Sequence, residues 1–483
     1  MPKAAYATLG CKVNAYETEA IARLFAEEGY ARVPFGEGEE DVELVVVNTC
    51  AVTHAAEKKS RQLVRRAVRL YPRAIVVVTG CAAQLAPETF ARIPGVDVVV
   101  GTSGRGNLGE LVRRARVRRG AGVREPVVAV GEILRVREYE ELPALGSFEH
   151  TRAYLKVEEG CSNHCTFCTI PRAKGPVRSR RIADALREAE ELVARGYREI
   201  VLTGTHLGAY GEDGEAALSG VDEGEVRAAG GPLAYLVLRL AEIPGLWRIR
   251  LSSVEVGQLD ARFVRTLAAA GKVAPHFHVP LQSGDDAVLA RMRRRYTTRE
   301  YREAIERLRA YFPEAAVTTD VIVGFPGETE SSFARTRAFL EEVGFAQLHV
   351  FPYSPRAGTA AAKFADAVSE AEKRLRVAEL LDLDRELRRR FRRRFLGRAV
   401  DVLPEVVLPP THPAVREAGV GKGDGAPTVL EGTSGEYLRV LVPSSSRLLG
   451  VPMRVRIERE VGEVLWGFPL RVLEGSREKV ELA

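Results

Sequence analysis

The chain has 483 residues, which is long for one hydrophobic core and favours about three domains. Hydrophobic residues make up 46% of it, no apolar run reaches the roughly 18 residues that cross a membrane, and the N-terminus lacks a signal-peptide pattern, so we expect a cytoplasmic protein rather than a membrane or secreted one. The net charge of +6 fits a polyanionic partner such as RNA and equally fits a solvated, Arg-rich surface.

The first segment alternates short apolar runs with stretches of helical period. The expected strands cover residues 4–9, 42–47, 74–78 and 96–100, and the clearest expected helices cover residues 16–28 and 54–71. Such alternation is typical of a parallel sheet covered by helices. We therefore predict an α/β domain over residues 1–122, followed by a linker over residues 123–146.

The second segment repeats this alternation six times. Strands are expected at residues 154–157, 199–203, 248–252, 276–280, 317–323 and 347–351. Helices are expected at residues 181–196, 234–243, 259–270, 285–312 and 331–343. Six units are too few for a closed eight-unit barrel, so residues 147–385 predict an open (β/α)6 partial barrel with its working face at the carboxyl ends of the strands. Residues 211–231 have no clear period and are interpreted as a surface loop.

A long charged helix is expected at residues 369–395, and it contains a run of arginines at residues 388–394. Beyond Gly397 the pattern changes to short β-like runs at residues 399–403, 437–442, 453–457 and 470–472. These predict a small all-β domain over residues 386–483. The Pro- and Gly-rich residues 404–432 are interpreted as a loop or irregular hairpin.

Three of the six cysteines, Cys161, Cys165 and Cys168, follow the first strand of the central domain with C-x3-C-x2-C spacing. Thiolates favour zinc, copper(I) or iron–sulfur clusters. A structural zinc site requires a fourth ligand, for which His164 is the nearest candidate, although its position beside Cys165 strains the geometry. A [4Fe–4S] cube can instead take three cysteines and leave one iron open, and we favour this interpretation.

The other three cysteines, Cys11, Cys50 and Cys81, each come just after an expected strand of the first domain. The carboxyl ends of parallel strands meet at one edge of a sheet, so these thiols are expected to converge. The alternative is three unrelated buried cysteines, a common core residue. Their matching positions favour a second cluster with three protein ligands and one free iron.

The cysteine motifs together resemble those of the radical S-adenosylmethionine (SAM) methylthiotransferases. The segment GCSNHCTFCTIPRAKGPVRSR at residues 160–180 resembles the cluster loop of radical SAM enzymes. The resemblance to methylthiotransferases rests on LGCKVN (9–14), NTCAVT (48–53), TGCAAQ (79–84), LTGTHLGAYG (202–211), HVPLQSGDDAVLARMRRRYT (278–297), DVIVGFPGETE (320–330) and FPYSPRAGTAA (351–361). It covers almost the whole chain and implies a C-terminal domain of the RNA-binding TRAM type.

The resemblance implies two [4Fe–4S] clusters and S-adenosyl-L-methionine as cofactors. The cluster on Cys161, Cys165 and Cys168 would bind and reductively cleave SAM to give a 5′-deoxyadenosyl radical, and the cluster on Cys11, Cys50 and Cys81 would carry the inserted sulfur. A second SAM molecule would supply the methyl group. The chemistry belongs to the cofactors, which the protein positions and shields.

The resemblance also implies a set of SAM-contacting residues at strand ends. They are Phe167 beside the adenine, Gly204 and Thr205 near the methionine amino group, and Ser253, Glu255, Gln282 and Gly324 along the cofactor site. Ordinary packing is the alternative for Phe167 and Ser253. Four histidines near strand ends, His206, His276, His278 and His349, fit a structural role at least as well as a catalytic one.

The segment Lys12-Val13-Asn14 resembles the subgroup that acts on N6-threonylcarbamoyladenosine at position 37 of tRNA, although Ala15 stands where that subgroup usually has Gln. We therefore predict methylthiolation at C2 of this nucleoside. The alternatives are isopentenyladenosine 37, an aspartate of a ribosomal protein, and a non-enzymatic iron–sulfur RNA-binding redox sensor. The enzyme would also require a one-electron reductase, such as flavodoxin or ferredoxin, and a sulfur donor.

Basic residues fit an RNA substrate, because arginine pairs well with phosphate. We predict RNA contacts at Arg178, Arg180, Arg388, Arg392, Tyr437 and Arg439. Arg291, Arg293, Arg294 and Arg295 form a further basic group. A solvated helix face is the alternative for the run at residues 388–394.

Overall fold

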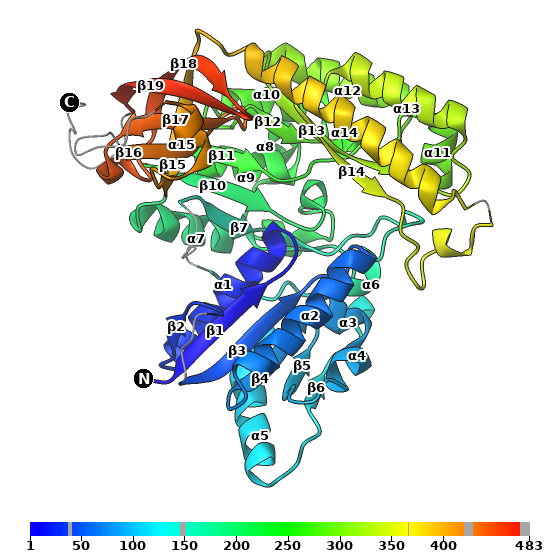
Figure 1. Ribbon diagram of the computed structural model, residues 1–483, viewed down its shortest axis with the longest axis vertical. Coiled ribbons are helices and arrows are strands. Elements are labelled where there is room, and N and C mark those ends of the chain that lie inside the picture. The colour runs from blue at the N-terminus through cyan, green and yellow to red at the C-terminus, as the bar shows by residue number, and fades with distance from the viewer. Residues whose placement is uncertain (37–40, 145–150, 366, 420–427, 474–483) are drawn as a thin grey trace.

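The computed structural model describes residues 1–36, 41–144, 151–365, 367–419 and 428–473. It contains an N-terminal α/β part, a central α/β part and a C-terminal β-barrel (Figure 1). The long helix α14 (Glu370–Arg393) runs along the central part and ends beside the barrel (Figure 1). The predicted three-part α/β architecture is confirmed.

The N-terminal part is a fully parallel six-stranded sheet of order β2-β1-β3-β4-β5-β6. Its strands are β1 (Lys3–Thr8), β2 (Ala31–Val33), β3 (Val42–Thr49), β4 (Ile75–Gly80), β5 (Val98–Val100) and β6 (Val127–Ala129). Its helices are α1 (Lys12–Glu27), α2 (His54–Leu70), α3 (Cys81–Leu85), α4 (Pro87–Ala91) and α5 (Leu108–Gly120). The valines of β3 and β4 are buried because helices cover both faces of the sheet.

The four predicted strands are confirmed, and two further strands were not predicted. Strands β2 and β6 have three residues each, too few for a period to be recognised. Because β6 pairs with β5, the prediction of a linker starting at residue 123 is wrong: the sheet extends to Ala129. The end of that predicted linker, residues 145–146, lies outside the described residues.

The central part is an open barrel of six parallel strands, as predicted. Its two three-stranded sheets, β7-β10-β11 and β12-β13-β14, are joined by isolated parallel bridges such as Ser253 to His278. The strands are β7 (Ala153–Lys156), β10 (Glu199–Thr203), β11 (Arg248–Leu251), β12 (His276–His278), β13 (Ala316–Val323) and β14 (Gln347–Pro352). The outer helices are α7 (Ile182–Ala194), α9 (Pro232–Ala241), α10 (Ala261–Ala269), α11 (Asp286–Arg291), α12 (Thr298–Tyr311), α13 (Glu330–Val343) and α14.

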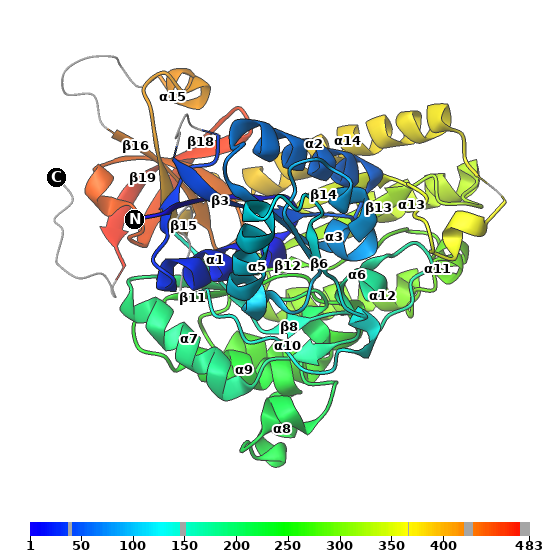
Figure 2. The same ribbon diagram turned by 90° about the horizontal axis from the view of Figure 1, so that it is seen from below.

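Two predictions for the central part are wrong in detail. The single helix expected over residues 285–312 is two helices, α11 and α12, because Arg293 adopts a left-handed backbone (φ 57°) and Thr297 caps a new helix. The loop expected over residues 211–231 contains α8 (Glu223–Ala229), which Asp222 caps. Helix α8 projects from the lower edge of the molecule in Figure 2 and packs against α9.

The C-terminal part is a closed five-stranded barrel of order β15-β16-β17-β19-β18. Its strands are β15 (Ala399–Leu408), β16 (Thr428–Ser434), β17 (Arg439–Ser444), β18 (Met453–Val461) and β19 (Val464–Val472). The predicted boundary at residue 386 is wrong, since it falls inside α14. Within the described part of residues 404–432, β15 extends to Leu408, α15 spans Pro413–Glu417 and β16 begins at Thr428. Because β15 and β16 pair antiparallel, the hairpin alternative for this stretch is confirmed and the loop is wrong. Residues 420–427 and 474–483 lie outside the described residues.

Among the helices of the described residues, none combines the length and the apolar composition that a membrane span requires.

Five charged side chains are buried where the N-terminal and central parts meet. Glu17 on α1 is 2.7 Å from Arg105 and 2.6 Å from Lys174. Glu159 is 3.3 Å from Arg105, 3.1 Å from Lys174 and 3.0 Å from Lys156. All five side chains are at most 3% exposed. We call these residues the buried ion network, and it joins the two parts through charges that no water reaches.

We expect Arg105→Met to lower the free energy of unfolding by about 3–5 kcal/mol, because removing one partner leaves buried carboxylates without compensation. The matched control is Arg113→Met, which breaks a pair with Glu110 that is about 60% exposed and contributes roughly 0–1 kcal/mol. Urea unfolding followed by circular dichroism compares them. Equal midpoints for the two variants would contradict the expectation.

Candidate active site at the carboxyl ends of the strands

Cys11, Cys50 and Cys81 lie at one edge of the N-terminal sheet. Each directly follows a strand or its short turn: Cys11 precedes α1 after β1, Cys50 follows β3, and Cys81 opens α3 after β4. Strands β1, β3 and β4 are neighbours with aligned ends, since Thr8 pairs with Asn48 and Asn48 pairs with Thr79. The backbone therefore places the three cysteines at one edge of the sheet, as predicted.

Two asparagines hold this edge together. The Asn14 amide donates to Leu9 O at 3.0 Å, to Asn48 Oδ1 at 3.1 Å and to Thr49 O at 3.1 Å, and Asn48 donates to Asn14 O at 3.0 Å. Gly80 has φ 96°, and a Cβ there would lie 2.3 Å from Asn48 Oδ1. Sequence reasoning missed this role of Asn48 and Gly80. The one sequence feature that could have indicated it is that both residues lie within two positions of a cysteine, in the segments NTC and TGC.

Cys161, Cys165 and Cys168 lie in a single loop between β8 (Glu158–Glu159) and α6 (Ile170–Lys174). Backbone hydrogen bonds fix the loop: Cys161 N donates to Gly175 O at 3.0 Å, and Cys168 N donates to Cys165 O at 3.1 Å. Arg294 donates to Cys165 Sγ at 3.3 Å and pairs with Glu255. Arg294 therefore belongs to the cysteine site, and its assignment to a basic RNA-facing group is wrong.

The thiols are poorly suited to carry charge without a metal. Burial, and to a smaller extent the neighbouring cysteines of the same triad, raise the pKa of Cys81 to about 12, that of Cys161 to about 12 and that of Cys168 to about 11. A bound cation must therefore stabilise the thiolates. Each triad thus has the donor chemistry that a metal cluster requires.

The spacing of the sulfurs fits a cluster better than one ion. Tetrahedral zinc, with Zn–S bonds of 2.3 Å, holds sulfurs about 3.8 Å apart. Within the described part of the chain, the one group of three such ligands within 4.8 Å of one another is His278, Asp320 and His349, so neither cysteine triad is that compact. His164, the alternative zinc ligand, is exposed. Both triads are therefore wider than a single zinc ion requires, as a site for an iron–sulfur cube must be.

Two cavities adjoin the loop that contains Cys161, Cys165 and Cys168. One of about 200 Å³ is lined by Phe167, Cys168 and Gln282 from the central part and by Val52 and Thr53 from the N-terminal part. The other, of about 220 Å³, is lined by Cys165, His206, Glu255, Arg294 and Tyr296, among others. The first cavity is thus bounded by both cysteine-bearing parts, and Val52 and Thr53 are contributions that the sequence did not predict.

The structure brings together some of the predicted SAM-contacting residues. Phe167 and Gln282 line the first cavity and Glu255 the second, whereas Thr205, Ser253 and Gly324 line neither. Gly204 packs against Glu158, and a Cβ there would lie 2.7 Å from Glu158 Oε2.

Two of the predicted RNA contacts are wrong. Arg178 and Arg180 are each only 1% exposed. Arg178 donates to Lys174 O at 2.9 Å, and Arg180 pairs with Glu141 and Glu188. Their charges hold the cysteine loop to its neighbours, so no phosphate can reach them.

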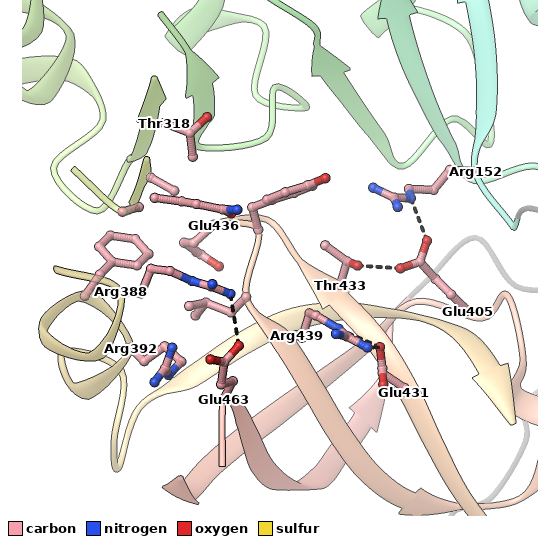
Figure 3. A pocket seen from close by; sticks show the side chains of 16 residues that line it. Arg152, Thr318, Arg388, Arg392, Glu405, Glu431, Thr433, Glu436, Arg439 and Glu463 are labelled. Atoms are coloured by element: carbon pink, nitrogen blue, oxygen red, sulfur yellow. Dashed lines mark hydrogen bonds and ion pairs between the residues drawn. The ribbon is translucent and has the colours of Figure 1, made fainter. Parts of the chain in front are cut away.

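The other four predicted RNA contacts line a cavity of about 300 Å³ between α14, the central strands and the barrel (Figure 3). Arg388 lies 3.6 Å from Glu463, Arg392 lies 3.4 Å from Glu460, and Arg439 pairs with Glu431. The ring of Tyr437 stacks on His276 with centroids 4.2 Å apart. Each arginine thus has a carboxylate partner with which an RNA phosphate must compete, and the four contacts stay a prediction.

Two family models match this chain and indicate its class of protein. A family model described as the radical SAM superfamily matches residues 155–340, and one described as the uncharacterized protein family UPF0004 matches residues 3–101. These matches cover the loop with Cys161, Cys165 and Cys168 and the edge with Cys11, Cys50 and Cys81.

The particular relatives follow from whole-chain similarity. The chain is 40% identical over 458 residues to the threonylcarbamoyladenosine tRNA methylthiotransferase MtaB of Bacillus subtilis, covering 95% of this chain and 94% of the relative. It is 37% identical to the protein of that name from Aquifex aeolicus, covering 83% and 92%. It is 34% identical to the tRNA-2-methylthio-N(6)-dimethylallyladenosine synthase of Symbiobacterium thermophilum, covering 95% and 92%. The chain therefore belongs to the radical SAM tRNA methylthiotransferases.

The buried carboxyl group of Glu158 is expected to make the free energy of unfolding depend on pH. Burial and the neighbouring Glu159 raise its pKa to about 8, although the hydrogen bond from His206 N opposes the shift. Because the folded state holds this proton more tightly than the unfolded state, the stabilisation is complete below about pH 4.5 and is lost as the pH rises toward 8. We expect Glu158→Gln to gain stability relative to wild type, from about 2 kcal/mol at pH 6 to about 4–5 kcal/mol at pH 9.

Urea unfolding at several pH values measures this gain, with Glu110→Gln as an exposed control. If the free energy of unfolding changes with pH in the same way for wild type and Glu158→Gln, Glu158 is not the group that causes the pH dependence.

Proposed function

We propose that the chain methylthiolates C2 of N6-threonylcarbamoyladenosine at position 37 of tRNA, using two [4Fe–4S] clusters and SAM. The observation that carries the proposal is the cavity bounded by Cys168 and Phe167 on one side and by Val52 and Thr53, just after Cys50, on the other. A substrate there would contact Cys168 of one triad and, beside Cys50 of the other, the two residues that follow it after one intervening position. The names of the relatives from Bacillus subtilis and Aquifex aeolicus support the same reaction.

The six cysteines are the proposed cluster ligands in two triads. When bound, the clusters supply the electron that cleaves SAM and the sulfur that is transferred. The chain positions these groups: Arg294 donates a hydrogen bond to Cys165 Sγ, which stabilises negative charge on that sulfur. Phe167 and Gln282 are proposed to contact the adenosyl group, and Glu255 orients Arg294.

Of the remaining predicted SAM contacts, Gly204 and Gly324 are proposed to act through close packing. A Cβ at Gly324, where φ is 70°, would lie 2.3 Å from Lys373 Cγ. Thr205 and Ser253 stay proposals based on the family motif alone.

The tRNA is proposed to contact the junction of α14 with the barrel, through Arg388, Arg392, Tyr437 and Arg439. Arg439 is the most open of the three arginines, with 61% of its side chain exposed. A one-electron reductase and a sulfur donor are required because the reaction consumes an electron and a sulfur atom at each turnover. We propose a cytoplasmic location, where tRNA is modified.

The proposed reaction is tested with reconstituted full-length protein and tRNA bearing either N6-threonylcarbamoyladenosine or N6-dimethylallyladenosine at position 37. We expect a methylthio product from the first and at least tenfold less from the second, since a factor of ten requires about 1.4 kcal/mol of selectivity. Mass analysis of the digested nucleosides measures both. A product from the dimethylallyl tRNA alone would assign the chain to the other substrate class.

The two triads are tested with Cys50→Ala and Cys165→Ala. We expect each variant to lose about half of the iron and sulfide, because each triad holds one cube with no fourth protein ligand. Cys165→Ala should also lose reductive SAM cleavage, whereas Cys50→Ala should still release 5′-deoxyadenosine without a methylthiolated product.

Loss of all iron in either single variant would mean that the six cysteines hold one shared centre. Zinc without iron in the wild-type protein would contradict the radical chemistry altogether.

A further inference from the structure

The loop after β14, residues 353–360, connects the central part to the backbone beside Cys50. In Figure 1 this loop extends from the end of β14 toward α2 and α6. Arg356 on the loop donates a hydrogen bond from Nη2 to the carbonyl oxygen of Ala51 at 2.8 Å, and Ala51 directly follows Cys50. The same guanidinium pairs with Glu57 on α2. Arg356 thus reaches from one cysteine-bearing part of the molecule to the other.

Two further contacts hold this loop in place. His54 Nε2, at the start of α2, lies 2.6 Å from the carbonyl oxygen of Pro355. Arg172 on α6 donates from Nη1 to the carbonyl oxygen of Ala357 at 2.6 Å. The loop is therefore held from the N-terminal part and from the segment that follows Cys168. Its position does not depend on Arg356 alone.

Most of the guanidinium of Arg356 has no hydrogen-bond partner. The residue is only 4% exposed. Its Nη2 group makes the two contacts given above, whereas Nε and Nη1 are buried and have no partner among the described residues. Buried N–H groups in folded proteins nearly always have an acceptor, and leaving one on a charged group without an acceptor costs about 1–3 kcal/mol or more. These two nitrogen atoms therefore require an acceptor that the neighbouring side chains do not supply.

The surroundings narrow the choice of acceptor. A phosphate of tRNA does not reach a guanidinium that is 4% exposed. Asp320 lines the same cavity of about 200 Å³, and its carboxylate lies 3.3 Å from His278 Nε2. Burial raises the pKa of the Cys50 thiol, and the charge of Arg356 acts against that effect. The sulfur atoms of a cluster bound at Cys50 are acceptors of suitable charge at this place.

A second cation near the same triad differs from Arg356 in this respect. The charge of Lys174 acts on Cys81 as that of Arg356 acts on Cys50. However, the Lys174 ammonium already donates to Glu17 at 2.6 Å and to Glu159 at 3.1 Å. Lys174 is thus committed to the buried ion network, whereas Arg356 keeps N–H groups for a ligand.

We propose that Arg356 is a positioning residue for the cluster on Cys11, Cys50 and Cys81, holding the Cys50 loop through Ala51 and donating hydrogen bonds from Nε and Nη1 to the sulfur atoms of the cluster. The inference rests on the second cluster of the proposed function. Hydrogen bonds to cluster sulfurs stabilise the more negative, reduced state and so raise the reduction potential. Arg356 therefore makes the cluster that carries the sulfur easier to reduce.

The reduction potential of this cluster tests the inference. It is measured on reconstituted full-length Cys165→Ala protein, which is expected to keep this cluster alone, by titration with dithionite followed by electron paramagnetic resonance. In this background we expect Arg356→Met to disfavour reduction about tenfold, which lowers the potential by about 59 mV for one electron. Arg356→Lys should recover part of the loss, because it keeps a cation with N–H donors.

The matched control is Arg172→Met, which removes the other arginine hydrogen bond to the same loop. It should leave the potential unchanged, because the donors of Arg356 remain. The inference is refuted if Arg172→Met lowers the potential as much as Arg356→Met does, since Arg356 would then only hold the loop. An unchanged potential in Arg356→Met refutes it as well.

A second measurement does not require Arg356→Met to fold. In Cys165→Ala protein with isotopically labelled arginine, the reduced cluster should show a magnetic coupling to arginine nitrogen. Arg356→Lys should abolish this coupling at equal iron content. A coupling that persists in Arg356→Lys, or that is absent from the parent protein, contradicts the inference. If the Cys165→Ala protein holds no iron–sulfur cluster at all, the two-cluster function itself has failed, and the role of Arg356 with it.

Discussion

The buried ion network of Glu17, Arg105, Lys156, Glu159 and Lys174 is the constraint on which the relative position of the two cysteine triads depends. Removing an ion from water costs several kcal/mol, which the opposite charges offset only when their geometry is held. A shift of the N-terminal part against the central part would separate these charges without rehydrating them. Lys174 also lies close enough to Cys81 for its charge to lower the pKa of that thiol, against the effect of burial. The network thus couples the alignment of the two parts to the electrostatics of one triad.

The two triads are assembled by different means. Cys161, Cys165 and Cys168 occupy one loop of eight residues, so local backbone hydrogen bonds are enough to place them. Cys11, Cys50 and Cys81 come from three separate strands and converge only after β1, β3 and β4 have paired. Cluster binding at the second triad is therefore linked to the folding of the whole N-terminal sheet, whereas binding at the first depends on one loop and its contact with Arg294. The cavity lined by Cys168, Val52 and Thr53 forms only when both parts are in place.

Prediction from sequence succeeded where chemistry is encoded locally. Buried valine-rich strands and the cysteine spacings are signals within a few residues, and the architecture and both triads followed from them. It failed where the outcome depends on a distant partner. Arg178 and Arg180 lie in a basic segment that resembles an RNA-binding one in sequence. In the structure, carboxylates of Glu141 and Glu188 and neighbouring carbonyls accept their hydrogen bonds. Arg294 looked like part of a basic surface and instead contacts Cys165 and Glu255.

The sequence by itself determined the order of most strands and helices and the class of cofactor, and it predicted the six cysteine ligands, because period and spacing are properties of neighbouring residues. Only the tertiary structure decided which charges are exposed and which are paired. It also placed Val52 and Thr53 in a cavity with Cys168. Charge pairing and cavity formation require residues from separate elements to meet, and the packing of a parallel sheet against an open barrel, rather than any local pattern, determines which ones do.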